Sequence, residues 1–212
     1  MSPYTIPSDL PTLKRKYPGW AKLVEKMTER TIRSEGVKRV LGISYRQLHD
    51  WEKERGILHS RSVGQSGKKG SSWRRFSILD LIILGIFTEA KKRSIPVTKL
   101  KEVIGDIYLS QFMVVDAFPG VVYGLDLFFV TDLETSFEYW CADRMEPLVK
   151  IPILKPRGIQ TLVIIPMCPI IDHVFEMLNR QDFEATKKPE GGYSFKINGV
   201  PLALEGLTKK EN

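Results

Sequence analysis

Residues 41–51 have the sequence LGISYRQLHDW, and this stretch decides the fold predicted for the front half of the chain. The apolar positions before it recur at the spacing of a helix over about residues 34–41. Gly42 interrupts that pattern, and Ser44 is of a residue type that caps helix starts by accepting a hydrogen bond from a free amide. A second helix is therefore predicted over about residues 45–55. Two helices separated by a short glycine-containing turn are the layout of a helix-turn-helix.

The predicted second helix has two chemically different faces. Leu48 and Trp51 fall on one face and are expected to pack into the core of the motif. The opposite face is polar and comprises Tyr45, Arg46, Gln47, His49 and Lys53. Such a face is typical either of an ordinary solvated surface or of a helix that reads base edges in the major groove of DNA. Arg46 is the favoured DNA contact, because a guanidinium binds guanine or phosphate through two parallel hydrogen bonds.

Two short apolar runs follow, at Ile57-Leu58 and at residues 73–76, on either side of a loop rich in Gly, Ser and Lys. Apolar runs around a flexible basic loop predict a β-hairpin, here called the wing. The glycines of this loop do not have the spacing of a nucleotide-binding motif. Arg74 is the favoured wing contact because a strand end holds it, although one arginine of the pair could instead brace the wing. The wing residues predicted to reach phosphates or the minor groove are Lys68, Lys69, Trp73, Arg74 and Arg75.

The 212-residue chain has a formal net charge of +7, which is spread unevenly. Residues 1–76 hold 17 Lys and Arg against 7 Asp and Glu, whereas residues 111–212 hold 10 against 14. A basic front part and a mildly acidic back part suggest two modules with different partners. The front part is suited to a polyanion such as DNA, although a lysine-rich soluble surface would give the same charge.

Composition indicates a globular protein. Hydrophobic residues are 42% and charged residues 27% of the chain, which is enough apolar material for a packed core. The longest uncharged apolar stretch, Leu81–Thr88, is too short to span a membrane, and the first residues lack a secretion-signal pattern. Two cysteines do not make a disulfide scaffold, which favours a reducing compartment. We therefore expect a soluble cytoplasmic protein with no membrane partner.

The rest of the chain is predicted to alternate between helices and strands. Residues 1–19 contain four prolines and are predicted to form an extended arm, followed by a short helix over residues 20–30. Ser77 is predicted to cap a buried apolar helix that runs to about Arg93. The remaining expected elements are a helix from Val97 to about residue 109, strands over residues 125–130, 137–140 and 162–165, a helix over residues 169–178, and a hairpin turning at Asn198-Gly199.

These elements predict an α+β protein with three parts. Residues 1–30 form the N-terminal arm and short helix. Residues 31–110 form a mostly α-helical winged helix-turn-helix domain. Residues 111–212 form a small α+β domain that serves dimerisation, effector binding or partner binding.

Residues 31–109 resemble the winged helix-turn-helix of the MerR family of transcriptional regulators. The resemblance implies a homodimer that binds double-stranded promoter DNA and distorts it. It also implies a cytoplasmic bacterial protein, nucleoid-associated when bound, with RNA polymerase and a small-molecule effector as further candidate partners. The residues that carry the resemblance are LGISYRQL at 41–48, Trp51-Glu52, Gly56-Ile57-Leu58, WRRFS at 73–77, Asp80-Leu81 and Ile95-Pro96-Val97.

No arrangement of residues predicts catalysis, a cofactor or a metal site. The three histidines, His49, His59 and His173, are dispersed along the chain. Cys141 and Cys168 are each flanked by apolar sequence, so we favour buried structural thiols over nucleophiles or metal ligands. Several aromatic residues of the back half either line an effector pocket or, as we expect, form the core: Phe128, Phe129, Phe137, Tyr139, Trp140, Phe175 and Tyr193.

The favoured functional hypothesis is a homodimeric, sequence-specific DNA-binding transcriptional regulator, and not an enzyme. The alternative is an architectural or excision factor of a phage or mobile element, which bends DNA without controlling a promoter. A recombinase is a less favoured third class. A recombinase domain needs clustered arginines, whereas the arginines of residues 111–212 are dispersed at Arg144, Arg157 and Arg180.

Overall fold

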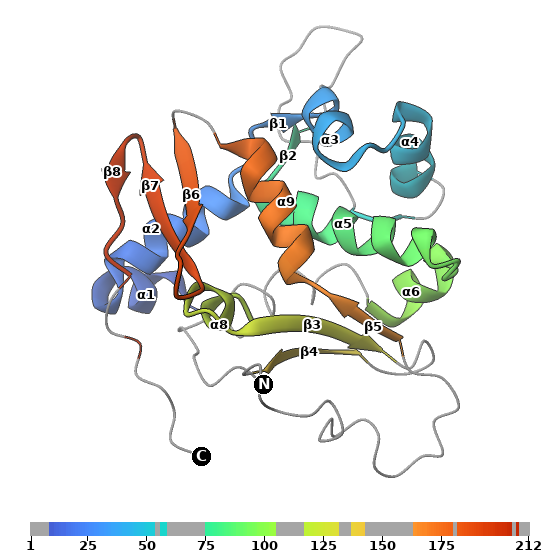
Figure 1. Cartoon of the computed structure of the whole chain (residues 1–212). Coiled ribbons are helices and arrows are strands. Elements are labelled where there is room, and N and C mark those ends of the chain that lie inside the picture. Colours follow the sequence, from blue (N-terminus) through green and yellow to red (C-terminus); the bar gives the residue numbers. More distant parts are fainter. Residues whose placement is uncertain are drawn as a thin grey trace, which may run out of the picture.

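The computed structural model of the chain describes residues 9–53, 56–58, 75–104, 117–131, 137–142, 163–179, 182–204 and 207. Its helices are α1 (Leu10–Lys16), α2 (Pro18–Thr28), α3 (Ser34–Leu41), α4 (Tyr45–Lys53), α5 (Ile78–Lys92), α6 (Val97–Ile104), α8 (Phe118–Val122) and α9 (Cys168–Leu178). Its strands are β1 (Ile32–Arg33), β2 (Arg75–Phe76), β3 (Asp126–Thr131), β4 (Phe137–Ala142), β5 (Val163–Pro166), β6 (Phe183–Lys187), β7 (Tyr193–Ile197) and β8 (Val200–Pro201). Helices combined with small separate sheets confirm the predicted α+β class (Figure 1).

Helix α9 lies at the centre of the arrangement, between the sheet β6–β7–β8 on one side and helices α3 and α5 on the other (Figure 1). The predicted inward face of Ile170, Val174, Phe175 and Leu178 is buried, and Ile171 joins it. Because these residues contact elements from both halves of the chain, α9 connects the front half to the back half.

An aromatic cluster surrounds Phe175. The centroid of its ring lies 5.2 Å from that of Tyr193, 5.7 Å from that of Phe195 and 5.8 Å from that of Phe183. Aromatic pairs of this kind contribute about 0.5–1.5 kcal/mol each beyond the area they bury. Phe175 and Tyr193 are thus core residues, as expected, and Phe129 is fully buried as well. The other aromatic candidates are Phe128, which is half-buried, and Phe137, Tyr139 and Trp140, whose side chains lie outside the described part of the structure.

The strands of the back half form two antiparallel sheets. Strand β3 pairs with β4 on one side and with β5 on the other, and all three correspond to predicted strands. In the second sheet, β7 and β8 are joined at Asn198 and Gly199, whose φ angles are 52° and 75°, as an Asn-Gly hairpin turn requires. Strand β6 was not predicted; its alternation of buried Phe183 and Ala185 with polar residues is short and extends along only five residues.

Helix α5 is buried on almost all sides, as its apolar composition predicts. Its first turn has a complete capping box, in which the Asp80 amide donates to Ser77 Oγ (3.0 Å) and the Ser77 amide donates to Asp80 Oδ2 (2.8 Å). Arg30 Nε lies 3.7 Å from the same carboxylate and partly compensates its burial. Although α5 is strongly apolar, no helix in the described part of the chain has the length and apolarity needed to cross a membrane.

Helices α5 and α9 are in close contact at Gly85. A methyl group at Gly85 would lie only 2.3 Å from Cγ2 of Ile170, which is well inside van der Waals contact. The backbone of α5 can therefore meet Ile170 only because residue 85 has no side chain. The contact belongs to a continuous hydrophobic cluster that extends from Leu13 to Phe195.

The expectation of an extended N-terminal arm is wrong for residues 10–16, which form α1, and for residues 18 and 19, which begin α2. Pro11 and Pro18 occupy first-turn positions of these helices, where the missing amide proton costs no hydrogen bond. Asp9 caps α1, because its carboxylate accepts a hydrogen bond of 2.8 Å from the Thr12 amide. The hydrogen bonds from Thr12 also hold the pKa of the Asp9 carboxyl below its ordinary value.

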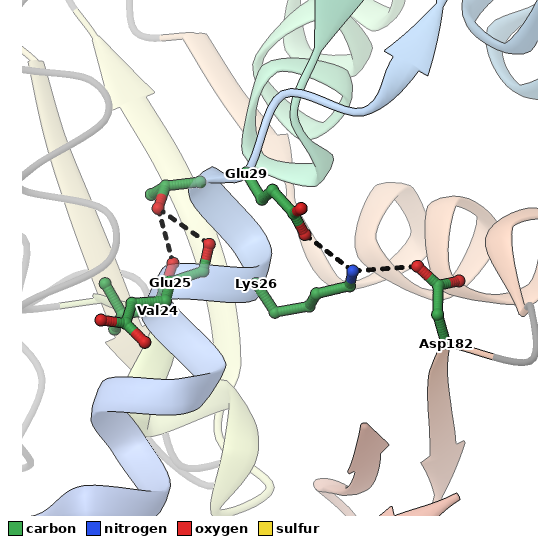
Figure 2. A network of polar contacts seen from close by, with 6 residues as sticks. Val24, Glu25, Lys26, Glu29 and Asp182 are labelled. Atoms are coloured by element: carbon green, nitrogen blue, oxygen red, sulfur yellow. Dashed lines mark hydrogen bonds and ion pairs between the residues drawn. The ribbon is translucent and has the colours of Figure 1, made fainter. Parts of the chain in front are cut away.

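Lys26 connects α2 to the sheet of the back half (Figure 2). Its Nζ atom lies 2.7 Å from Glu29 Oε2 and 2.9 Å from Oδ2 of Asp182, which immediately precedes β6. Burial of the Lys26 side chain lowers the pKa of its ammonium, but the hydrogen bonds to Glu29 and Asp182 outweigh burial, so the pKa is raised overall. The folded state therefore favours the charged form of Lys26.

Replacing Gly85 with Ala should lower the free energy of unfolding by up to about 2 kcal/mol, because overpacking costs about 1–3 kcal/mol and helix propensity returns about 1 kcal/mol. Denaturant unfolding of the full chain measures this change. In an Ile170→Ala background the clash is absent, so Gly85→Ala should there be neutral or stabilising. Equal destabilisation in both backgrounds would show that the Gly85–Ile170 contact is not its cause.

Replacing Lys26 with Met should lower the free energy of unfolding by about 1 kcal/mol or less near neutral pH. The loss is small because the two carboxylate partners are partly exposed and become hydrated when the ammonium is removed. The pKa of Lys26 is raised above 10.5 in the folded state, so its contribution is fully present below pH 10.5 and is lost as the pH rises through the folded-state pKa. On the alkaline side of neutrality, the difference in unfolding free energy between the wild type and Lys26→Met should shrink as the pH rises through that range. A difference that is unchanged by strong alkali would contradict the assigned ion pair.

Candidate nucleic-acid interface

Helices α3 and α4 are joined by a turn whose geometry follows from its sequence. Helix α3 ends at Leu41, as predicted, and Gly42 then adopts the left-handed conformation, with φ of 67°. The Gly42 amide donates a hydrogen bond of 2.9 Å to the carbonyl oxygen of Lys38, which closes the end of α3. Because an L side chain is strained at this φ, glycine is the residue that allows the chain to turn sharply here.

Helix α4 begins where Ser44 predicts. Ser44 Oγ accepts a hydrogen bond of 3.1 Å from the Gln47 amide, which is the capping interaction expected from the sequence. Leu48 and Trp51 are both 2% exposed and form the inner face of the helix, as predicted. The rings of Trp51 and Phe87 are 6.2 Å apart, so α4 is fixed directly on α5. This packing determines which side of α4 faces outward.

The outer face of α4 carries the residues predicted to contact DNA. Tyr45 is 64% exposed, which is unusual for a large aromatic side chain. Arg46 and His49 are also exposed, and Gln47 is half-buried. Lys53 is the last residue of α4, but its side chain lies outside the described part of the structure. The structure thus brings four of the predicted residues together on one short, well-supported helical surface.

A second element faces this surface. A hollow of about 720 Å³ lies between α4 and the turn that joins α5 to α6. Arg46 and His49 line it from α4, and Lys91 and Ser94 line it from the opposite side. We call this space the α4 hollow; its other lining residues are Ser44, Gln47, Asp50, Trp51, Ile95 and Val97. The cationic side chains of Arg46 and Lys91 outnumber the one carboxylate of the lining, Asp50, so the hollow has a net positive charge that suits a phosphate group.

Sequence reasoning did not nominate Lys91 or Ser94. The available signal is the run of charges Lys91-Lys92-Arg93 that directly precedes Pro96. That run identifies a basic helix end, but only the packing of Trp51 against Phe87 places it opposite Arg46. The contribution of the α5–α6 turn is therefore a tertiary feature.

The predicted pairing of the wing is wrong in its first strand. Ile57 and Leu58 do not form a strand; the Ile57 amide donates to the Trp51 carbonyl (2.8 Å), and Leu58 has a left-handed φ of 54°. Strand β2 instead pairs with β1, which places exposed Arg75 opposite exposed Arg33. Ile57 and Leu58 belong to the turn that follows α4, and β2 pairs with β1 instead. The other predicted wing residues, Lys68, Lys69, Trp73 and Arg74, lie outside the described residues.

Cys168 is the first residue of α9. Its Sγ atom accepts a hydrogen bond of 3.3 Å from the Leu127 amide. Burial raises the pKa of the Cys168 thiol, and a protonated thiol is a poor nucleophile and a poor metal ligand. These properties agree with the structural thiol favoured from the sequence. Cys141 is on β4, whose side chains lie outside the described part, and no group of three or more metal-ligating side chains occurs among the described residues.

Comparison of the chain with protein families, curated proteins and solved structures finds no match. The geometry of α3, α4 and the α4 hollow is therefore the basis for a functional proposal.

Replacing Ser44 with Ala should destabilise the protein by about 1 kcal/mol, because the Gln47 amide loses its capping partner. Ser44→Asp is the matched control and should retain most of the stability, since Asp caps helices as well as Ser does. Chemical denaturation of both variants measures the difference. If Ser44→Asp were as unstable as Ser44→Ala, the cap would not be the stabilising interaction at this position.

Proposed function

We propose that the protein is a sequence-specific DNA-binding transcriptional regulator that acts as a homodimer. In this proposal α3 and α4 are a helix-turn-helix of the MerR type, and α4 lies in the major groove of DNA. The observation that carries the proposal is the outer face of α4. It presents Tyr45, Arg46, Gln47 and His49 on a helix that a left-handed glycine turn, a serine cap and the Trp51–Phe87 contact hold in place.

The chemistry of this face fits base recognition. Arg46 can donate two parallel hydrogen bonds to guanine, and Gln47 can pair with adenine. His49 lies one turn further along the same face and can donate or accept a hydrogen bond. Since the helix is fixed on α5, these groups can be presented without reordering the backbone, which limits the entropy lost on binding.

The α4 hollow supports the same orientation. With α4 in the groove and Arg46 on a base edge, the DNA backbone would run along the side of the helix, within reach of Lys91 on the other wall of the α4 hollow. Contacts of this type fix the register of the protein on the duplex and carry no sequence information. Exposed Arg33 and Arg75 on the paired strands β1 and β2 provide a second basic surface beside the same unit.

Homodimerisation is part of the proposal because one short helix reads only a few base pairs. Helix-turn-helix proteins reach useful specificity by binding two half-sites, about one helical turn apart, with two copies of the recognition helix. The proposal includes a cytoplasmic location, where the protein would reach promoters and could contact RNA polymerase.

Selection of binding sites from genomic DNA, at a fixed salt concentration, tests the proposal with the full chain. An inverted repeat upstream of genes is expected. Arg46→Ala should cost about 1–3 kcal/mol on that site and relax specificity at one base position. Lys91→Ala should weaken binding to all sequences about equally and reduce the magnitude of the salt slope by about 1.

Arg15→Ala is the matched control, because it removes one exposed guanidinium from α1. It should change specific binding far less than Arg46→Ala does. Recovery of no motif, or equal effects of Arg15→Ala and Arg46→Ala, would refute base recognition by α4. Bending of the selected site without any response of a promoter reporter would assign the protein to architectural DNA-binding factors instead.

A further inference from the structure

The last turn of α5 separates two hollows. Lys91 and Ser94 line the α4 hollow, whereas Lys92 and Arg93 line a second hollow on the side of α9. We call the second space the junction hollow; its volume is about 330 Å³. Its walls come from the end of α3, from α5, and from the β5–α9 connection, so it lies where the front and back halves of the chain meet.

The junction hollow has an apolar part. Leu41 of α3 and Ile170 of α9 line this part beside Gly85, and Pro166 and Pro169 extend the apolar lining on the side of α9. The hollow opens beside the contact of Gly85 with Ile170, where the two helices diverge. Its volume is at the lower end of the range for small-molecule sites, about 300–1,000 Å³, which fits a ligand with a single ring.

The polar part of the junction hollow has an excess of positive charge. Lys92 Nζ is 2.6 Å from Glu89 Oε1, so this pair is neutral in sum. Arg93 is exposed, and among the described residues it forms no ion pair. His173 lines the hollow from α9, and its Nε2 atom lies 2.7 Å from the Val40 carbonyl oxygen. An apolar wall beside an unpaired guanidinium is complementary to an apolar molecule with one carboxylate.

We propose that the junction hollow binds a small apolar carboxylate, with the apolar body against the lining of Leu41, Pro166, Pro169 and Ile170 and the carboxylate on Arg93. We further propose that this ligand weakens DNA binding. This second step rests on the proposed function, whereas the binding step does not.

The structure offers a direct physical path for the coupling. Arg93 directly follows Lys92 at the end of the same helical turn that presents Lys91 to the α4 hollow. A carboxylate on Arg93 adds negative charge close to the surface where DNA phosphates would bind. Leu41 and the Val40 carbonyl, which His173 contacts, also lie immediately before the Gly42 turn that leads into α4.

Calorimetric titration of the full chain tests the binding step, with benzoate as the probe and benzamide as its uncharged counterpart. Benzoate should bind. The affinity of benzamide should be at least about tenfold lower, because benzamide lacks the charge that Arg93 recognises. Arg93→Ala should reduce benzoate affinity by about tenfold or more, and the matched control Arg15→Ala should leave it unchanged. Thr88→Leu fills the hollow without altering its charge and should also abolish binding.

Absence of benzoate binding, equal affinity for benzamide, or equal effects of Arg93→Ala and Arg15→Ala would overturn the site. Thermal unfolding of each variant distinguishes loss of the site from loss of the fold. The site stands if the variants remain folded and only Arg93→Ala and Thr88→Leu lose the probe.

Measurement of DNA affinity with and without saturating benzoate tests the coupling step. The ligand should weaken specific DNA binding by about fivefold or more, and DNA should weaken benzoate binding by the same factor, because the coupling is reciprocal. Unchanged or tighter DNA binding would overturn the coupling. A protein that binds benzoate but no specific DNA would refute the proposed function and leave the site intact, whereas DNA binding without benzoate binding would do the reverse.

Discussion

The close contact of α5 with α9 at Gly85 and Ile170 is the constraint on which the rest of the structure depends. Helix α5 is too apolar to face water, and α9 covers it from the back half of the chain. The same helix α9 places Phe175 in the aromatic cluster on its other side. Helix α9 therefore has two hydrophobic faces to bury. The absence of a side chain at residue 85 of α5 allows one of these faces to pack against α5 while the other packs in the aromatic cluster.

This arrangement makes the proposed recognition surface dependent on residues far away in the sequence. Helix α4 is supported by α5, and α5 is supported by α9. The His173–Val40 hydrogen bond and the Lys26–Asp182 ion pair add polar links between the same two halves. The unequal charge of the front and back parts suggests two modules, and their boundary stays a prediction. Their shared hydrophobic cluster nevertheless shows that they are packed as one body of protein.

Much of the local structure could be predicted from the sequence because it depends on local rules. Gly42, Ser44 and Ser77 act through bonds to residues three or four positions away, and the Asn198-Gly199 turn requires only its own φ angles. The errors arose where a residue type has two uses. Proline is typical of an extended chain, but it also fits the first turn of a helix, where Pro11 and Pro18 lie. For Pro11, the capping residue Asp9 is the local feature that marks the start of the helix.

The remaining features depend on tertiary packing that no local pattern carries. An apolar dipeptide such as Ile57-Leu58 is compatible with a strand or with a helix-ending turn, and the positive φ of Leu58 is decided by the chain around it. The partner of β2 is β1, more than forty residues earlier, and both are only two residues long. Likewise, the outer face of α4 was predicted from helical spacing, but the opposing wall at Lys91 was not. The outer face of α4 follows from the local sequence, whereas the position of Lys91 opposite that face depends on how α4 packs on α5.

The position of α9 in the chain also has a consequence for how the protein is made. A ribosome releases α3, α4 and α5 well before it has synthesised residues 168–178, so the apolar side of α5 that α9 covers stays bare while about eighty further residues are added. A nascent chain at that stage has its glycine turn and its serine cap, but it lacks the helix that buries α5. Translation that stalls in this interval would leave an aggregation-prone intermediate that chaperones would have to bind. A gene truncated there would yield an aggregating fragment in place of a free DNA-binding module.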